Sequence, residues 1–330
     1  MTAIEPTTWP ITFSDVARAR ERVARYLTTT PCRAYPLLDA ATELSVFVKH
    51  ENHQPTGSFK VRNGLSFMTG LTADERRRGV VAASTGNHGQ GIAYGAALLG
   101  VSAVICVPEG NNPEKNEAMR AWGATVVEEG RDYDESVHTM ERIAREEGRI
   151  VAHSTNHPRI VAGAGTMTLE LVEQLGPDQI DAVVLAVGGG SQAVGALTVV
   201  RELAPNVEIY GVQAAGAAAQ HDSWHARERR TTLRADTFAE GVATRSTYDL
   251  TFAALLEGLA GFVTVTDAEI AEGVRLILSA THNVVEGAGA MGLMGAMKLR
   301  DRLRGKRVVV AFCGGNLDSR VLRRILNREM

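Results

Sequence analysis

The stretch Val183-Val-Leu-Ala-Val-Gly-Gly-Gly-Ser-Gln192 decides the fold class of this chain. Its apolar residues predict a buried strand, and the three glycines after them predict a tight turn that leads into a helix. Similar strand patterns alternate with amphipathic helix patterns through the sequence, which is typical of parallel sheets covered by helices on both faces. We therefore predict an α/β protein with strands at residues 46–48, 80–83, 103–107, 125–127, 183–187, 208–212, 262–265 and 307–312, and helices at residues 58–71, 114–122, 133–147, 160–175 and 267–280.

The composition is that of a globular protein, because 45% of the 330 residues are hydrophobic, 22% are charged and the net charge is −3. With this net charge the chain has no excess of positive charge that would attract nucleic acid or an anionic membrane. The three cysteines are too few and too far apart for a disulfide framework or a Cys-rich metal site. Residues 1–12 lack a signal-peptide pattern, and the uncharged stretch 89–108 contains glycines that predict a buried helix followed by a strand. We expect a cytoplasmic protein.

No Pro/Ser-rich linker divides the chain, so a second domain is expected to be inserted rather than tethered. Residues 52–149 could close a sheet of their own, with strands that begin at Val80, Ala103 and Thr125. We therefore expect a larger domain from residues 1–51 and 150–330, a smaller inserted α/β domain from residues 52–149, and a ligand site in the cleft between them.

Three predicted strands end in turns of small polar residues that lead into helices. The three junctions are Ala83-Ser-Thr-Gly-Asn-His88, Val187-Gly-Gly-Gly-Ser-Gln192 and Phe312-Cys-Gly-Gly-Asn316. Helix N-termini bind anions, and ligands of open α/β sheets gather beyond the carboxyl ends of the strands, so we expect one shared, anion-binding site. Glycine lets the main chain wrap around a phosphate, although the same residues also form turns without a ligand. Likewise, the first junction could hold a carboxylate or simply cap a helix.

The second junction also matches a loose dinucleotide-binding pattern through Gly188, Gly190 and Ala193. That pattern requires an acidic residue at the end of the following strand, where this chain has Gln213. The sequence therefore disfavours an NAD site.

Lys60 lies in the stretch Gln54-Pro-Thr-Gly-Ser-Phe-Lys-Val-Arg-Asn63, which leads into an amphipathic helix pattern. Most lysines are solvated surface charges, but burial at a helix start beside a pocket would lower the pKa of the Lys60 amine and allow it to form an imine. One such amine, together with several anion-binding turns, is what an aldehyde cofactor carrying a phosphate requires. These residues indicate an enzyme that uses pyridoxal 5'-phosphate.

From about Ser14 to the C-terminus, the motifs resemble in type and order those of the fold-type II pyridoxal-phosphate family, which includes serine and threonine dehydratases and serine racemase. The resemblance implies two three-layer domains, with the cofactor bound by the larger one, and a Schiff base on Lys60. It also places Cys313 against the pyridine nitrogen. A neutral thiol, unlike a carboxylate, cannot keep that nitrogen protonated, which favours prompt elimination of a β-leaving group. The other implied site residues are Phe59 against the cofactor ring, Asn87 at the ring hydroxyl, Gly188, Gly189, Gly190, Ser191 and Gln192 around the phosphate, Gly241 beside the cofactor, Glu286 behind it, Ser84, Thr85 and His88 around the substrate carboxylate, and Thr155 near the substrate side chain.

Several positions depart from the family's pattern. Thr85 stands where racemases have a serine that acts as an acid–base group, which lowers the expectation of racemisation. Gln213 and Ala219 stand where the family's cation site often has acidic residues, so we expect no bound metal. His221 and His225 have the spacing of a metal pair but no third ligand nearby, and a solvated helix face is expected instead.

The expected reaction is β-elimination from a β-hydroxy-α-amino acid, which yields a 2-keto acid and ammonia, with Lys60 as the general base for the α-proton. L-Threonine and L-serine are the default substrates, whereas Thr155, Asn63 and the run 214–219 suggest a bulkier or more polar one. The alternatives are a racemase or β-replacement enzyme of the same family, and a non-catalytic protein that binds a phosphate-bearing ligand. The resemblance also implies a homodimer or tetramer.

Overall fold

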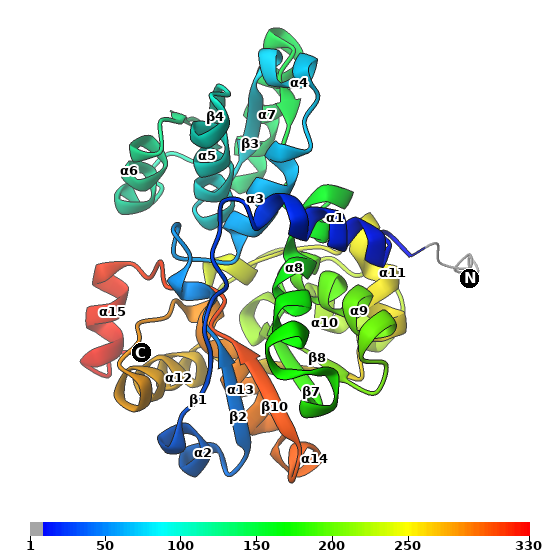
Figure 1. Ribbon diagram of the computed structural model, residues 1–330. Helices are drawn as coiled ribbons and strands as arrows, with labels where there is room; N and C mark the ends of the chain where they lie inside the picture. Colours follow the sequence, from blue (N-terminus) through cyan, green and yellow to red (C-terminus); the bar gives the residue numbers. More distant parts are fainter. Residues whose placement is uncertain (1–8) are drawn as a thin grey trace.

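The computed structural model describes residues 9–330, whose strands form two sheets (Figure 1). Residues 1–8, part of the N-terminal stretch that lacks a signal-peptide pattern, lie outside the described residues. All pairs of neighbouring strands are parallel except β1–β2, which confirms the predicted α/β class. The larger sheet has the order β1 (Cys32–Ala34), β2 (Ser45–Lys49), β10 (Arg307–Ala311), β7 (Ala182–Ala186), β8 (Glu208–Ala214), β9 (Gly261–Val265), and the smaller has the order β5 (Thr125–Glu128), β4 (Ala103–Val107), β3 (Val80–Ala83), β6 (Ile150–Val151).

Both faces of the smaller sheet are covered by helices, because its strands are apolar on both sides. Val80 and Ala82 of β3 belong to a buried cluster with Ile92 of α5 (Asn87–Leu99). Val81 and Ala83, the alternate residues of the same strand, belong to a second cluster with Met140 of α7 (Tyr133–Glu147). Since successive side chains of a strand point to opposite faces, the continuous apolar run of β3 follows directly from this double burial.

The larger sheet also carries two helical layers (Figure 1). In one, α9 (Ser191–Leu203) packs on β7 and β8 and is covered by α8 (Pro158–Leu175). In the other, α13 (Gly287–Lys298) packs on β7, β8, β9 and β10 and is covered by α12 (Asp267–Thr281). A Cβ on Gly292 of α13 would lie 2.9 Å from the Val184 carbonyl oxygen, so glycine allows α13 to approach the sheet this closely.

Helix α3 (Lys60–Thr69) connects the two halves of the molecule. It packs against α5 beside the smaller sheet and against α8 beside the larger one, and α1 (Phe13–Val23) packs on both α3 and α8. Its first residue is Lys60, so the position of this side chain depends on both halves. The remaining helical elements described are α2 (Pro36–Thr42), α4 (Ala73–Arg78), α6 (Pro113–Ala121), α10 (Ala219–Ala226), α11 (Asp249–Gly258), α14 (Arg300–Leu303), α15 (Ser319–Leu326), η1 (Glu51–His53), η2 (Pro177–Gln179), η3 (Ala215–Ala217) and η4 (Glu240–Val242).

Four charged side chains, each at most 2% exposed, are buried together where α3 meets α8. Arg62 donates from Nε to Glu51 Oε2 at 2.7 Å and from Nη2 to Glu170 Oε1 at 3.0 Å. Lys49 donates from Nζ to Glu170 Oε1 at 2.6 Å, so two cations balance two carboxylates. Burial opposes the ionisation of Glu170, but Arg62 and Lys49 still hold its pKa at about 2. This network ties the first turn of α3, which begins at Lys60, to the larger half of the molecule.

All the strands and helices predicted by residue range are present, and their ends agree with the prediction to within two residues. The prediction missed β1, whose side chains are largely exposed and lack an apolar pattern, and β6, which has only two residues. Because Ile150 and Val151 pair with β3, we propose that the smaller domain extends through β6 instead of ending at residue 149. In residues 9–330, no helix is both long and apolar enough to cross a membrane.

Candidate active site

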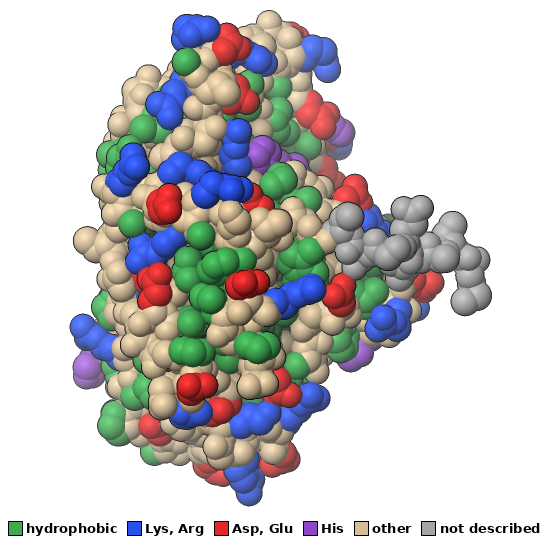
Figure 2. Space-filling view, turned by 45° about the vertical axis from the view of Figure 1, so that its right-hand side comes forward, with side chains coloured by type: hydrophobic (Ala, Val, Ile, Leu, Met, Phe, Trp, Pro, Cys, Tyr) green, Lys and Arg blue, Asp and Glu red, His purple; other side chains and the backbone are tan. Residues whose placement is uncertain are grey.

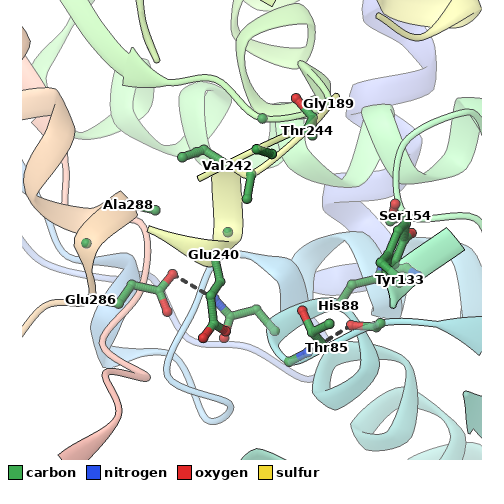
Figure 3. A pocket seen from close by; sticks show the side chains of 18 of the residues that line it. Thr85, His88, Tyr133, Ser154, Gly189, Glu240, Val242, Thr244, Glu286 and Ala288 are labelled. Atoms are coloured by element: carbon green, nitrogen blue, oxygen red, sulfur yellow. Dashed lines mark hydrogen bonds between the residues drawn. The ribbon is translucent and has the colours of Figure 1, made fainter. Parts of the chain in front are cut away.

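One cavity of about 920 Å³ opens where the three sequence junctions meet, after β3, β7 and β10. In Figure 3, Glu286 and Ala288 lie on one side of it, and Thr85, His88, Tyr133 and Ser154 lie on the other. The structure brings every site residue proposed from the sequence to the lining of this cavity. They are Phe59, Lys60, Ser84, Thr85, Asn87, His88, Thr155, Gly188, Gly189, Gly190, Ser191, Gln192, Gly241, Glu286 and Cys313.

The loop before Lys60 is held against the end of β10. The main-chain N–H of Phe59 donates to the Cys313 carbonyl oxygen at 3.0 Å, and Ser58 forms an isolated β-bridge with Gly314. Burial lowers the pKa of Lys60 to about 8, although Cys313 and Glu286 partly oppose the shift. An appreciable fraction of this amine is therefore uncharged near neutral pH and able to attack a carbonyl.

The triple-glycine turn leads into α9 without a capping side chain. The first N–H groups of α9 are consequently left for a ligand, and the N-terminus of the helix favours an anion there. Gly190 has φ of +93°, and a Cβ on Gly189 would lie 2.1 Å from Thr155 Oγ1, so both positions require glycine. Thr251 Oγ1, from α11, donates to the Gly189 carbonyl oxygen at 2.6 Å and holds the turn in place. The turn thus has the donors and the space that a phosphate group requires.

The junction after β3 is organised by its own side chains. Ser84 Oγ accepts hydrogen bonds from the main-chain N–H groups of Gly86, at 3.2 Å, and Gly89, at 2.9 Å. Since the N-cap residue Gly86 has no side chain and Ser84 takes the N–H of Gly89, the N–H groups of Asn87 and His88 remain at the start of α5 to bind a carboxylate. Asn111 Nδ2 donates to the Thr85 carbonyl oxygen at 3.3 Å and ties the loop before α6 to this turn.

The His88 ring presents a hydrogen-bond acceptor to its surroundings. Its Nε2 lies 2.8 Å from the Ala152 carbonyl oxygen, so Nε2 carries the proton, and Nδ1 is buried without a partner. Burial lowers the pKa of His88 to about 3, with Lys60 adding to the shift, and the ring is neutral. A contact of His88 with a carboxylate would therefore use its main-chain N–H, whereas its ring suits a hydroxyl or ammonium donor.

Asn87 is oriented by two neighbours at the rear of the cavity. Its Nδ2 donates to Glu286 Oε1 at 2.7 Å, and its Oδ1 accepts from Asn316 Nδ2 at 2.7 Å. Asn316 Nδ2 also donates to the Thr56 carbonyl oxygen at 2.8 Å, which connects this chain of hydrogen bonds to the loop before Lys60. Burial raises the pKa of Glu286 and of the Cys313 thiol above their ordinary values, so Cys313 is a neutral thiol.

Several residues of the cavity were not found from the sequence. Tyr133, Ser154 and Tyr248 line one part of it, and Lys115 and Glu240 form an ion pair across it. Asn316 was quoted only as the end of the third junction, although its place after β10 beside Cys313 and two glycines was a usable signal. The others come from helix starts or loops, where the sequence has no pattern that marks them.

Other residues singled out in the sequence lie elsewhere. Asn63 is fully buried against α8 near Gly163, and neither it nor the run 214–219 lines the cavity, so these residues do not support the suggestion of a bulkier or more polar substrate through direct contact. His221 Nδ1 lies 2.9 Å from Asp222 Oδ1, and its ring packs against that of His225. Residues 9–330 contain no group of three or more His, Cys, Asp or Glu side chains placed to hold a metal ion.

Comparisons with known proteins agree with this site. Residues 23–314 match the family model described as pyridoxal-phosphate dependent enzyme, and the chain belongs to this family. It is 34% identical to an L-threonine ammonia-lyase of Thermotoga maritima, over 97% of this chain and 79% of that protein. It is 35% identical to an L-threo-3-hydroxyaspartate ammonia-lyase of a Pseudomonas species, over 93% of this chain and 95% of that one. The crystal structure of a T.th. threonine deaminase superposes with a TM-score of 0.88 at 34% identity, over 93% of this chain and 99% of that one.

The donor set of the cavity fits the family's cofactor. Lys60 provides a buried amine with a lowered pKa, and the triple-glycine turn provides uncapped N–H groups for a phosphate. Asn87 and Cys313 line the same cavity with neutral polar groups that suit an aromatic ring bearing a hydroxyl and a nitrogen. Pyridoxal 5'-phosphate is therefore the cofactor that this site is built to hold.

Proposed function

We propose that this protein is a pyridoxal-phosphate-dependent ammonia-lyase that converts a β-hydroxy-α-amino acid to a 2-keto acid and ammonia. The observation that supports this most directly is that three groups line one cavity: the Lys60 amine, the uncapped start of α9, and the start of α5 with the main-chain N–H groups of Asn87 and His88. An imine-forming amine, a phosphate site and a carboxylate site are the three requirements of amino-acid chemistry with this cofactor.

The proposed roles follow from the environment of each group. Lys60 would hold the cofactor and, once the substrate amine has replaced it, would take the α-proton, for which its pKa of about 8 is well matched near neutral pH. When bound, the cofactor supplies the electron withdrawal that makes the α-proton acidic. Asn87, fixed by Glu286 and Asn316, would orient the ring through its hydroxyl. The neutral Cys313 would leave the ring nitrogen unprotonated, which favours elimination over a long-lived carbanion.

L-Threonine and L-serine are the first substrates to test. A more polar β-hydroxy amino acid is a second candidate, because the wall of the cavity near Thr155 carries Tyr133, Ser154 and Tyr248. Tyr133 and Ser154 hydrogen-bond to each other, and the hydroxyl groups of this wall can also hydrogen-bond a polar side chain, whereas a methyl group forms no such bond. The similarity to a 3-hydroxyaspartate ammonia-lyase supports including such substrates.

The test is a panel of β-hydroxy amino acids that measures the keto acid, ammonia and the D-amino acid in the same reactions, with and without an added thiol. We expect stoichiometric keto acid and ammonia. Accumulation of the D-amino acid would favour a racemase, and a thioether product would favour β-replacement. A protein that shows no absorbance near the imine band, and is unaffected by Lys60→Ala, would instead be a non-catalytic phosphate-binding protein.

We also propose that the protein is a cytoplasmic homo-oligomer, most simply a dimer. Hydrophobic side chains gather near the centre of the face shown in Figure 2, which supports a contact with a second copy. Light scattering coupled to size-exclusion chromatography checks this, and a mass of one chain, 35.4 kDa, would contradict it.

A further inference from the structure

A second lysine lies beside the proposed carboxylate site. Lys115 belongs to the first turn of α6, and its side chain is only 12% exposed. A Cβ built on Gly86, the N-cap of α5, would lie 3.0 Å from Lys115 Cδ and 3.8 Å from Nζ. The ammonium group of Lys115 therefore lies against the turn that leads to the N–H groups of Asn87 and His88, where a carboxylate is proposed to bind.

The other positive charges that line the described cavity are less suited to this role. Arg131 is 87% exposed and pairs with Glu135, and Arg245 is 38% exposed and pairs with Asp134. Arg234 is also exposed. Lys60 is required for the cofactor, so Lys115 is the well-shielded cation left for the substrate.

Lys115 already has a partner on the other side of the cavity. Its ammonium forms an ion pair with Glu240, a carboxylate that is 49% exposed and immediately precedes Gly241. Once a substrate carboxylate is bound at the start of α5, the same ammonium faces two anions. Attraction to a shielded carboxylate exceeds that to a half-exposed one, because water screens the exposed charge.

We propose that Lys115 pairs with the α-carboxylate of the substrate and that Glu240 competes for the same ammonium, holding it while the site is empty. Lys115 would thus make the site specific for free amino acids over their amides and esters. This inference rests on the proposed function, because it assumes an amino acid at the α5 turn.

The test uses holoenzyme and L-alanine, which has no β-leaving group and therefore binds without elimination, with binding read from the change in cofactor absorbance. We expect Lys115→Met to weaken L-alanine binding about 10- to 100-fold, the usual effect of removing a hydrogen bond to a charged group. Glu240→Gln removes the competing anion, so it should leave L-alanine binding unchanged or tighten it up to about 5-fold. Lys115→Arg keeps the charge and should recover part of the loss.

The two substitutions separate this role from a merely structural one. If the ion pair only holds the two halves of the molecule together, Lys115→Met and Glu240→Gln will weaken binding to the same extent, and the inference is overturned. Binding of L-alaninamide provides a second readout, because this compound has no carboxylate. If the carboxylate is the partner of Lys115, Lys115→Met should change the affinity for L-alaninamide less than about 3-fold, which is the effect of losing a solvent-exposed charge contact. If both probes weaken equally, the inference fails while the proposed function stands. A wild-type holoenzyme whose absorbance responds to no amino acid would overturn both.

Discussion

Replacing Arg62 by Met tests whether the buried charges at the base of α3 hold the fold together. Arg62 is 1% exposed and donates to both Glu51 and Glu170 at 2.7 to 3.0 Å. Without it, two buried carboxylates share the single ammonium of Lys49. Removing one member of a buried charge network costs roughly 3–5 kcal/mol, so we expect the free energy of unfolding to fall by about that amount.

The matched control is Arg77→Met, because Arg77 also pairs with a carboxylate, Asp74, at 2.9 Å but is 70% exposed. An exposed pair contributes only about 0–1 kcal/mol. Urea denaturation of both variants, followed by circular dichroism, measures the difference. A loss of stability in Arg62→Met within about 1 kcal/mol of the control would refute the reasoning, since the two sites would then be energetically alike.

The effect of pH provides a second check on the same variant. In the wild type, Arg62 helps to hold the pKa of Glu170 at about 2, below its ordinary value of 4.5. The stability gained in this way is present above pH 4.5 and is lost as the pH falls toward 2. Arg62→Met lacks much of this gain, so the difference in the free energy of unfolding between the wild type and this variant should be largest near neutral pH and should shrink in acid. A difference that grows in acid would contradict the assignment.

Three further outcomes are expected. When pyridoxal 5'-phosphate is added to apo-protein, the rate of imine formation, followed by stopped-flow absorbance, should rise with pH and show an inflection near pH 8, because the uncharged Lys60 amine is the nucleophile. An inflection near pH 10.5, the ordinary pKa of lysine, would contradict the burial of Lys60. Gly189→Ala should weaken cofactor binding about 10- to 100-fold in equilibrium titration, because the methyl group of the alanine would lie 2.1 Å from Thr155 Oγ1. Unchanged binding would show that the turn does not hold the phosphate. Dialysis against EDTA should change neither activity nor thermal stability, because Gln213, which stands where the family often has an acidic cation ligand, is a neutral amide whose Oε1 accepts from the His221 N–H at 2.9 Å. A loss of activity or stability that Mg²⁺ or Ca²⁺ restores would contradict this.

Local sequence patterns were sufficient for much of the fold. Strand β3 could be predicted because its residues form an apolar run that is buried on both faces. The turn after β7 could be predicted because its glycines allow the close approach of neighbouring groups such as Thr155. The junction residues could be assigned to one site for the same reason, because the carboxyl ends of parallel strands meet at one edge of a sheet.

Contacts between distant parts of the chain could not be predicted in this way. The proton position on His88 is set by the Ala152 carbonyl, 64 residues away, and Lys49 and Glu170 are 121 residues apart. Lys115 occupies an ordinary surface position in the amphipathic pattern of α6. It becomes a site residue only because the loop before α6 is tied to Thr85 and because Glu240 approaches from the larger half. Asn63 shows the converse, since its unusual residue type suggested an effect on the site, but its side chain is fully buried in α3 and does not line the cavity.

The central claim is that a carbonyl-bearing cofactor is joined to one amine of this chain. Reduction of the purified holoenzyme with borohydride, followed by peptide mass spectrometry, tests it directly. The account predicts one reduced pyridoxal-phosphate adduct, on the peptide containing Lys60, and its loss in Lys60→Ala. An unmodified Lys60, or an adduct on another lysine such as Lys115, would contradict it.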